Sequence, residues 1–384
     1  MDKIYLAAAA AVVPGLGRAH MLKAVEKLGS AKALFEATEV TLRNLGLFRD
    51  VAIRNYLKNR STIVPETLAK VCEAKGIQII SYFDEEYPQS LKEIHDPPVV
   101  LYVMGNLPQN TYSIGIVGSR MATAYGLKCA RFFAQSMVAG GIPVISGGAT
   151  GIDSAAHAAA LESDGVTVAV LGCGVDVAYP AKNKQLFQGI LKRGALVSEF
   201  PPGTQPQARF FPLRNRIIVG LSRGVIVCEA AAKSGALITA RCAADEHREV
   251  YCVPGNIFEP TSIGCHNFIQ QGAHLISDPR EIFVDREAYF EKLKRGPVTE
   301  QQNLFATVPK ESQKLLPPKK MPVDLNGISD IGKQIYQILN QGAMTIDSLI
   351  EECQISFTEI SMELLDLQVA GLVDCDQQQK YFRV

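Results

Sequence analysis

The sequence lacks the patterns that would assign it directly to several common classes of protein. Its nine cysteines include no Cys-x-x-Cys pair, so the ligand spacing of a structural zinc site is missing. An odd number of cysteines scattered through apolar segments is typical of reduced, buried thiols in a cytosolic protein. We therefore expect no disulfide framework, no metal site and no cofactor.

Membrane segments and targeting signals are also lacking. No stretch approaches the ~18 consecutive apolar residues of a membrane-spanning helix. Residues 4–13 are apolar and follow Lys3, but this run is short and leads into Pro14-Gly15 without a cleavage site. The sequence thus predicts a soluble, cytoplasmic protein with no membrane partner.

Net charge is the third absence, because 39 basic residues balance 39 acidic ones. The total alone indicates no polyanionic partner. The distribution is more informative: residues 205–256 contain seven Lys or Arg against four Asp or Glu, whereas residues 325–384 contain three basic and nine acidic residues. The neutral total therefore combines a locally basic stretch with an acidic C-terminal segment.

Hydropathy patterns divide the 384 residues into four regions, consistent with two or three domains for this length. Residues 1–65 show apolar positions at helical spacing and predict a small helical domain. The turn at residues 13–17 resembles a helix-hairpin-helix (SAM-like) element, whose backbone N–H groups can bind a phosphate. A tight turn in a helical bundle would explain the same pattern.

Residues 66–285 carry short β-branched runs that alternate with helical segments. Such runs are expected of strands buried on both faces of a parallel sheet with right-handed crossovers. The expected strands are residues 77–80, 99–103, 113–117, 144–146, 166–171, 195–198, 225–228 and 250–253. We predict an α/β fold here, an extended Rossmann-type parallel sheet, followed by a linker over residues 286–324.

Residues 325–384 predict a winged-helix domain, because three helical stretches precede two short β-like runs. The candidate recognition helix, residues 356–370, contains three acidic residues and no Lys or Arg. Counterion release from DNA cannot drive binding to such a helix. We therefore expect this domain to contact protein rather than DNA.

Glycine-rich or basic loops follow several of the expected strands. Gly118-Ser119-Arg120 follows one strand, and Ser146-Gly147-Gly148 ends the next. In an open parallel sheet, ligands bind beyond the carboxyl ends of the strands. Glycine lets the backbone approach an anion, helix N-termini supply N–H groups, and Arg120 suits a phosphate. Any single turn of this kind is also common in purely structural connections, so the prediction depends on several at one sheet edge.

Paired aromatics beside basic residues form the most informative stretch. Phe210 and Phe211 lie next to Arg214-Asn215-Arg216, a combination that offers both stacking surfaces and phosphate contacts to a single strand. The alternative is that the phenylalanines are core residues and the arginines begin a solvated helix. Further along, Lys233-Ser234-Gly235 again lies between an expected strand end and a helix N-terminus.

A dinucleotide-binding enzyme is the obvious competitor, and the motifs do not fit it. The first loop reads Gly-Ile-Val-Gly-Ser-Arg over residues 115–120, which is not the G-x-G-x-x-G that binds a pyrophosphate. No Walker-type Gly-Lys-Ser or Gly-Lys-Thr is present either.

In order along the chain, these motifs resemble the DNA-processing protein A family (DprA, also called Smf). The matching residues are Gly118-Ser119-Arg120, Ser146-Gly147-Gly148-Ala149-x-Gly151-Ile152-Asp153 with His157, Gly172-x-Gly174-x-Asp176-x-x-Tyr179-Pro180, Ser198-Glu199-x-Pro201-Pro202-Gly203, Phe211-Pro212-x-Arg214-Asn215-Arg216-Ile217-Ile218, Glu229-x-x-x-Lys233-Ser234-Gly235-x-Leu237-Ile238-Thr239-Ala240, Val253-Pro254-Gly255 and Gln271-Gly272-Ala273.

The resemblance implies an extended Rossmann fold that forms a homodimer. It also implies binding of single-stranded DNA without strong sequence preference, protection of incoming DNA, and its delivery to the RecA recombinase during natural transformation. Arg120, Lys233 and the Arg214–Arg216 segment would line the basic pocket, and no catalytic reaction is implied.

The predicted DNA-binding residues are accordingly Gly118, Ser119, Arg120, Ser146, Gly147, Gly148, Phe210, Phe211, Arg214, Asn215, Arg216, Lys233, Ser234 and Gly235. The alternative from another class is a phosphoribohydrolase-like enzyme acting on nucleoside monophosphates, since such enzymes share this type of sheet. Those enzymes carry a Pro-Gly-Gly-x-Gly-Thr loop, which this sequence lacks.

Overall fold

The computed structural model describes residues 2–12, 16–109 and 112–284 and, with short gaps, residues 329–383. The chain divides into two compact units, residues 1–307 and residues 308–384. The first unit combines a helical segment with a nine-stranded sheet, and the second contains a three-stranded sheet.

The strands of the large sheet have the order β1-β2-β6-β5-β4-β3-β7-β8-β9. Seven of them are parallel: β3 (Ile114–Val117), β4 (Val144–Ser146), β5 (Thr167–Val170), β6 (Ala195–Ser198), β7 (Gly224–Val227), β8 (Glu249–Cys252) and β9 (His274–Leu275). β1 (Gln78–Ser81) and β2 (Val100–Gly105) extend the sheet antiparallel beyond β6. The sheet is therefore mixed and not wholly parallel as predicted. The sequence could not show this, because a buried β-branched run indicates burial and not strand direction.

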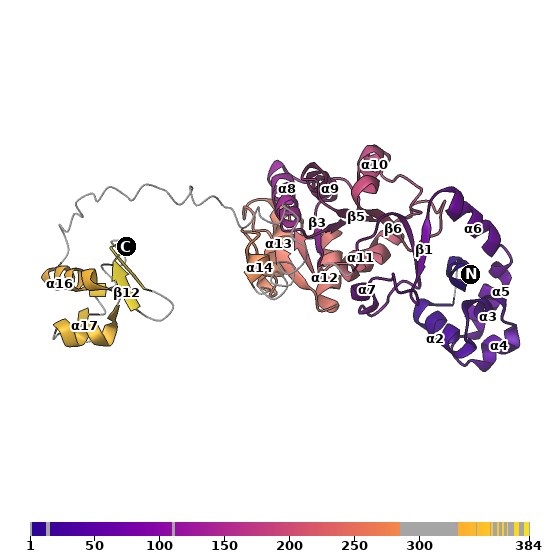
Figure 1. Cartoon of the computed structure of the whole chain (residues 1–384), viewed down its shortest axis with the longest axis horizontal. Coiled ribbons are helices and arrows are strands. Elements are labelled where there is room, and N and C mark those ends of the chain that lie inside the picture. The colour runs from indigo at the N-terminus through magenta and orange to yellow at the C-terminus, as the bar shows by residue number, and fades with distance from the viewer. Residues whose placement is uncertain are drawn as a thin grey trace. The chain divides into compact units, whose positions relative to one another are not determined.

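Helices cover both faces of this sheet, as Figure 1 shows. α8 (Ala124–Ala139), α9 (Ile152–Glu162) and α10 (Lys184–Arg193) lie on one face, and α7 (Gln89–Lys92), α11 (Phe210–Gly220) and α12 (Ala236–Asp245) lie on the other. From β3 to β6, each successive strand is added on the same side of the one before it in the sheet. The segment that contains α11 then crosses back, and β7 pairs with β3 on its other side. The strand order thus reverses at β3, the place where open α/β sheets bind ligands.

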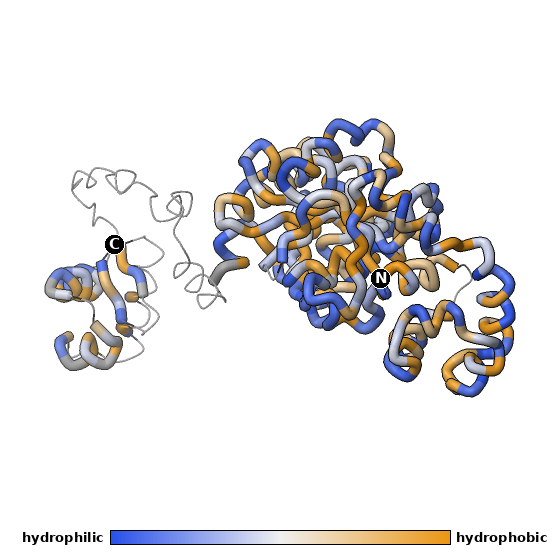
Figure 2. The backbone as a smooth tube through the Cα atoms, turned by 45° about the vertical axis from the view of Figure 1, so that its right-hand side comes forward, coloured by the Kyte–Doolittle hydropathy of each residue, from blue (hydrophilic) through white to orange (hydrophobic). Residues whose placement is uncertain are grey.

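Local sequence explains where these helices begin and which side they bury. The hydroxyl of Thr123 accepts a hydrogen bond from Gly126 N–H at 3.2 Å and caps the first turn of α8. Ala130, Phe133, Ala134 and Met137 recur at helical spacing and are all buried. Figure 2 shows hydrophobic (orange) and hydrophilic (blue) segments alternating along the backbone of this unit.

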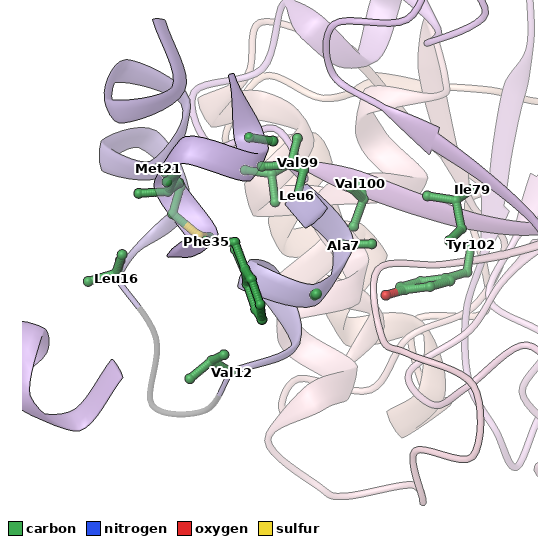
Figure 3. Packing of buried hydrophobic residues seen from close by; sticks show 14 of the residues in the cluster. Leu6, Ala7, Val12, Leu16, Met21, Phe35, Ile79, Val99, Val100 and Tyr102 are labelled. Atoms are coloured by element: carbon green, nitrogen blue, oxygen red, sulfur yellow. The ribbon is translucent and has the colours of Figure 1, made fainter. Parts of the chain in front are cut away.

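The helical segment contains α1 (Asp2–Ala11), α2 (Arg18–Leu28), α3 (Ala31–Glu36), α4 (Glu39–Asn44), α5 (Asp50–Arg60) and α6 (Pro65–Ala74). The apolar run that superficially resembled a signal is α1, whose Leu6 and Ala7 are buried near Val99 and Val100 of the sheet (Figure 3). The helices continue to Ala74, beyond the expected boundary at residue 65. Residues 13–15 of the predicted helix-hairpin-helix turn lie outside the described residues.

The second unit contains α16 (Asp330–Ile338), α17 (Ile346–Cys353), β10 (Met344–Thr345), β11 (Val373–Cys375) and β12 (Lys380–Arg383). β12 pairs antiparallel with both other strands. The core includes Ile335, Leu349, Leu364 and Leu367. The predicted linker, residues 286–324, and most of the predicted recognition helix, residues 356–370, lie outside the described residues.

The predicted α/β class is confirmed, with the antiparallel β1–β2 extension as the correction. None of the helices that the structure describes is long and apolar enough to cross a membrane.

Candidate nucleic-acid interface

The loops that follow β3 and β4 are joined by hydrogen bonds where the strand order reverses. Ile152 N–H donates to the Ser119 carbonyl oxygen at 3.1 Å, and the Thr150 hydroxyl donates to the Arg120 carbonyl oxygen at 3.2 Å. Gly151 has a φ of 78°, and a side chain there would collide with the Ser119 carbonyl. Two loops far apart in sequence therefore form one rigid support for the exposed Arg120.

Glu229, just after β7, fixes the β3 loop from the other side. Its buried carboxylate accepts hydrogen bonds from the Thr123 N–H at 3.1 Å and from the Thr123 hydroxyl at 2.7 Å. Its carbonyl oxygen accepts from Ser119 N–H at 2.8 Å. The loop that carries Arg120 is thus held by both neighbouring strands.

Arg214 lies beneath these loops and is only 5% exposed. Its Nη1 donates to the carbonyl oxygens of Gly147, at 2.5 Å, and Val170. A side chain at position 147 would lie 2.5 Å from the same nitrogen, so this approach requires glycine. Burial lowers the pKa of Arg214 to about 10, against the attraction of Asp153, so the group remains charged at neutral pH.

The predicted phosphate contact of Arg214 is therefore corrected: this guanidinium is used inside the fold. Asn215 is also buried and accepts a hydrogen bond from Arg214 Nε at 3.3 Å. Ser146, Gly147 and Gly148 are buried beside it, with the Ser146 hydroxyl donating to the Ile116 carbonyl oxygen at 2.6 Å. These five residues lie in the interior and hold the loops at this edge of the sheet from below.

Arg216 requires the same correction. Its side chain is 10% exposed, and its Nη2 lies 2.6 Å from Glu199 Oε2. Its Nε lies 3.3 Å from Asp96 Oδ2. Sequence reasoning could not detect this, because the acidic partners come from distant loops. Arg216, which the sequence predicts to contact a phosphate, instead forms ion pairs with Glu199 and Asp96 of the protein itself.

Two further buried polar residues from the recognised motif, Asp153 and His157, complete the interior. Burial raises the pKa of Asp153, although attraction to Arg214 opposes the shift. His157 Nδ1 lies 2.6 Å from the Thr167 hydroxyl, which itself donates to the Val144 carbonyl oxygen, so Nδ1 carries the proton. Burial, with repulsion from Arg214, lowers the pKa of His157 to about 3 and keeps the ring neutral.

Four aromatic rings lie above this interior, and we call them the aromatic platform: Tyr179, Phe200, Phe210 and Phe211. Tyr179 packs on Phe211 with ring centroids 5.7 Å apart, and Phe200 packs on Phe210 at 4.3 Å. Each pair carries a cation, since Arg120 Cζ lies 5.3 Å from the Phe211 centroid and Arg209 Cζ lies 5.2 Å from that of Phe210. Phe210 and Phe211 are both half-buried, and their stacking on bases stays a prediction. The solvated helix start of the alternative is wrong for Arg214 and Arg216, which are buried.

The loop after β7 adds a further cation at the same edge of the sheet. Lys233 is exposed there, Ser234 Oγ accepts from Ala236 N–H at 3.3 Å, and Gly235 precedes α12. Gly118 and Ser119 are partly exposed beside Arg120. Exposed cations and half-exposed rings together suit a ligand with phosphates and flat bases.

Sequence reasoning did not assign Tyr179, Phe200 and Arg209 to the site, although two of them lie in recognised motifs. Their role depends on ring contacts across three loops, which no local pattern reveals. Within the described residues, no group of three or more His, Cys, Asp or Glu side chains is placed to hold a metal ion.

Comparison with known proteins identifies two matching family models. The model described as DNA recombination-mediator protein A matches residues 78–287, and that described as DprA winged helix domain matches residues 319–376. The second match agrees with the predicted winged helix.

Individual relatives extend the match to nearly the whole chain. Protein Smf of Synechocystis is 32% identical over 97% of this chain and 96% of its own length. DNA processing protein DprA of Streptococcus pneumoniae is 44% identical over 54% of this chain and 73% of its own. The solved X-ray structure of the pneumococcal protein aligns with a TM-score of 0.64 and 35% identity, covering 74% of this chain and 98% of that one.

Replacing Arg214 tests its structural role. Arg214→Met should lower the free energy of unfolding by about 3 kcal/mol, because it leaves two buried carbonyl groups without their hydrogen-bond donor and removes the charge that attracts the buried Asp153. Urea unfolding measures the change. Arg209→Met, which removes an exposed arginine five positions earlier, is the matched control and should cost less than about 0.5 kcal/mol. Equal losses in the two variants would contradict the assignment.

The neutral His157 predicts acid sensitivity. Its folded pKa of about 3 lies below the ordinary 6.5, so only the unfolded chain takes up a proton between these values. The contribution of the neutral His157 to the free energy of unfolding is therefore complete above pH 6.5 and is lost as the pH falls toward 3. The difference in unfolding free energy between the parent and His157→Gln should shrink by about 2 kcal/mol from pH 7.5 to pH 5. A difference that stays constant with pH would exclude a buried neutral histidine.

Proposed function

Because the chain belongs to the DNA recombination-mediator protein A family, we propose that it binds single-stranded DNA without strong sequence preference and delivers it to the RecA recombinase. In this role it protects incoming DNA during natural transformation, acts in the cytoplasm and catalyses no reaction. The RecA and transformation parts are supported by family membership alone, and a binding assay with purified RecA checks the first.

The observation that carries the DNA proposal is the aromatic platform with a cation on each ring pair. A base stacked on an aromatic ring gains roughly 1–3 kcal/mol whatever its identity, which gives affinity without sequence readout. Single strands present such faces, whereas the bases of a duplex are already stacked on one another. Arg120 and Arg209 lie close enough to the rings to meet the phosphates that flank a stacked base.

The roles of the predicted residues follow from their exposure. We propose that Arg120, Arg209 and Lys233 contact phosphates, and that Phe210, Phe211 and Tyr179 stack on bases. Gly118 and Ser119 present backbone groups, with Ser234 and Gly235 beside Lys233. Arg214, Asn215, Arg216 and residues 146–148 position this surface from below.

The sheet edge at β9 supports the proposed homodimer. β9 is an edge strand, and Leu275 within it is 49% exposed, while Phe258 after β8 is 85% exposed. Edge strands and exposed apolar side chains of this kind pair with another chain unless they are protected. A second copy of this protein is the proposed occupant.

Salt titration of oligonucleotide binding tests the DNA proposal. The parent should prefer single strands over duplexes, and its affinity should fall steeply with salt, because neutralised phosphates release counterions. Arg120→Glu or Lys233→Glu should abolish binding, while Arg54→Glu, on an exposed position of α5, should bind like the parent. A protein ending at Asp285 should keep its single-strand affinity, since the acidic C-terminal unit is not expected to touch DNA.

Equal binding of single strands and duplexes, or parental binding by both the Arg120 and Lys233 variants, would contradict this proposal. Release of free base from a nucleoside monophosphate by the purified protein would instead support the phosphoribohydrolase-like alternative.

Sedimentation equilibrium tests the dimer. The parent should sediment as a dimer of a 41.7 kDa chain. Phe258→Asp with Leu275→Asp should shift it to monomer, because two carboxylates would lose their water at the interface. Val40→Asp, at an exposed apolar position in the helical segment, is the control and should leave the dimer intact. A monomeric parent would contradict the proposal.

A further inference from the structure

Two ion pairs connect the helical segment to one loop of the sheet. The loop at residues 199–204 follows β6 and carries Phe200 of the aromatic platform. One end of the loop begins at Glu199, and the other end turns at Gly203. Arg18 of α2 contacts the first end directly, and Lys75, just after α6, reaches the second end through Asp176.

At the first end, Arg18 of α2 shares acidic partners with Arg216. Arg18 Nε donates to Glu199 Oε2 at 2.9 Å, and Arg18 Nη1 donates to Asp96 Oδ2 at 2.9 Å. Arg216 contacts the same two carboxylates from α11. The Glu199 and Arg216 side chains are 7% and 10% exposed, so their half of this network is shielded from solvent, whereas Arg18 and Asp96 are 27% and 39% exposed.

At the second end, Lys75 follows α6 and pairs with Asp176. Lys75 Nζ lies 2.5 Å from Asp176 Oδ2, while Asp176 Oδ1 accepts from Gly203 N–H at 2.8 Å. Burial alone would raise the pKa of Asp176, but the hydrogen bonds from Lys75 and Gly203 outweigh it and the pKa is lowered. Asp176 is therefore ionised and links Lys75 to the turn of the loop.

The position of Phe200 depends on both ends. Its own N–H donates to the Ser198 hydroxyl at 3.0 Å, which fixes the start of the loop to β6. Beyond it, Thr204 N–H donates to the Pro201 carbonyl oxygen at 3.1 Å, and Gly174 N–H donates to the Thr204 carbonyl oxygen at 2.9 Å. Phe200 supports Phe210 from this loop, so a shift of the loop moves the surface on which bases would stack.

We propose that Arg18 and Lys75 are positioning residues for the DNA interface, through which the helical segment holds the 199–204 loop and its aromatic ring in the binding geometry. The inference rests on the proposed function of that interface. Neither side chain touches the aromatic platform itself. Arg18 acts through Glu199, and Lys75 acts through Asp176. Removing either pair should loosen the loop and weaken binding without removing a phosphate contact.

The charge of Asp176 gives the sharpest test. Asp176→Asn keeps an oxygen that can accept from Gly203 but removes a negative charge close to the interface. Long-range electrostatics alone predicts that this variant binds single-stranded DNA more tightly. Positioning predicts that it binds about fivefold more weakly, as Lys75→Met also should. The double variant Lys75→Met with Asp176→Asn should bind single-stranded DNA no more weakly than either single variant, because both substitutions break the same ion pair between Lys75 and Asp176.

The measurement is a fluorescence anisotropy titration of a single-stranded dT oligonucleotide with the full-length protein over a range of salt. Lys75→Met and Arg18→Gln should shift the line of log affinity against log salt downward and leave its slope unchanged. Arg120→Gln should instead reduce the slope by about 0.7, since one phosphate contact is lost. Lys70→Met and Arg54→Gln remove exposed cations from α6 and α5 and are the matched controls.

Hydrogen exchange of the free protein gives a readout that needs no DNA. The Gly203 and Thr204 amides should exchange faster in Lys75→Met than in the parent or in Lys70→Met. Tighter binding by Asp176→Asn, or parental binding and exchange in Lys75→Met while Arg120→Gln weakens binding, would overturn this inference alone. If the parent itself fails to bind single strands, the proposed function fails instead.

Discussion

The buried Arg214 guanidinium is the interaction on which the rest of the interface depends. It joins the carboxyl ends of β4 and β5 by donating hydrogen bonds to the carbonyl oxygens of Gly147 and Val170. Arg214 itself lies on α11, about one helical turn after Phe210 and Phe211. A charge in this place needs hydrogen-bond acceptors, and the two carbonyl groups supply them, while the nearby charge of Asp153 attracts the guanidinium. The half-exposed aromatic platform thus lies over a buried cation.

This constraint separates five basic residues at this edge of the sheet into two groups. Arg214 and Arg216 are buried and act on the protein, whereas Arg120, Arg209 and Lys233 are exposed and available to an anion. Three acidic residues act on the protein in the same way as Arg214 and Arg216: Glu199, Asp176 and Glu229 each hold a loop at this edge of the sheet. These exposed side chains are held in place only if the buried groups that support them are satisfied internally.

Much of the fold could be predicted, because burial leaves a periodic pattern in the sequence. The strands from β3 to β8 fall within a residue or two of the expected runs, and the glycine turns of residues 118 and 147–151 lie at one sheet edge as parallel strands require. The direction of β1 and β2 could not be predicted in this way, since hydropathy does not encode direction. Nor could the partners of Arg214 and Arg216, whose contacts span 67 and 17 residues of sequence.

The sequence by itself therefore determined the α/β class, the edge of the sheet that carries the motifs, and the family. Only the tertiary structure decided which cations face the solvent and which are buried. The reason is physical: an arginine in a motif has the same charge in either place, and the desolvation that distinguishes them depends on residues brought together by folding. The same holds for Tyr179, Phe200 and Arg209, whose ring contacts exist only once three loops meet.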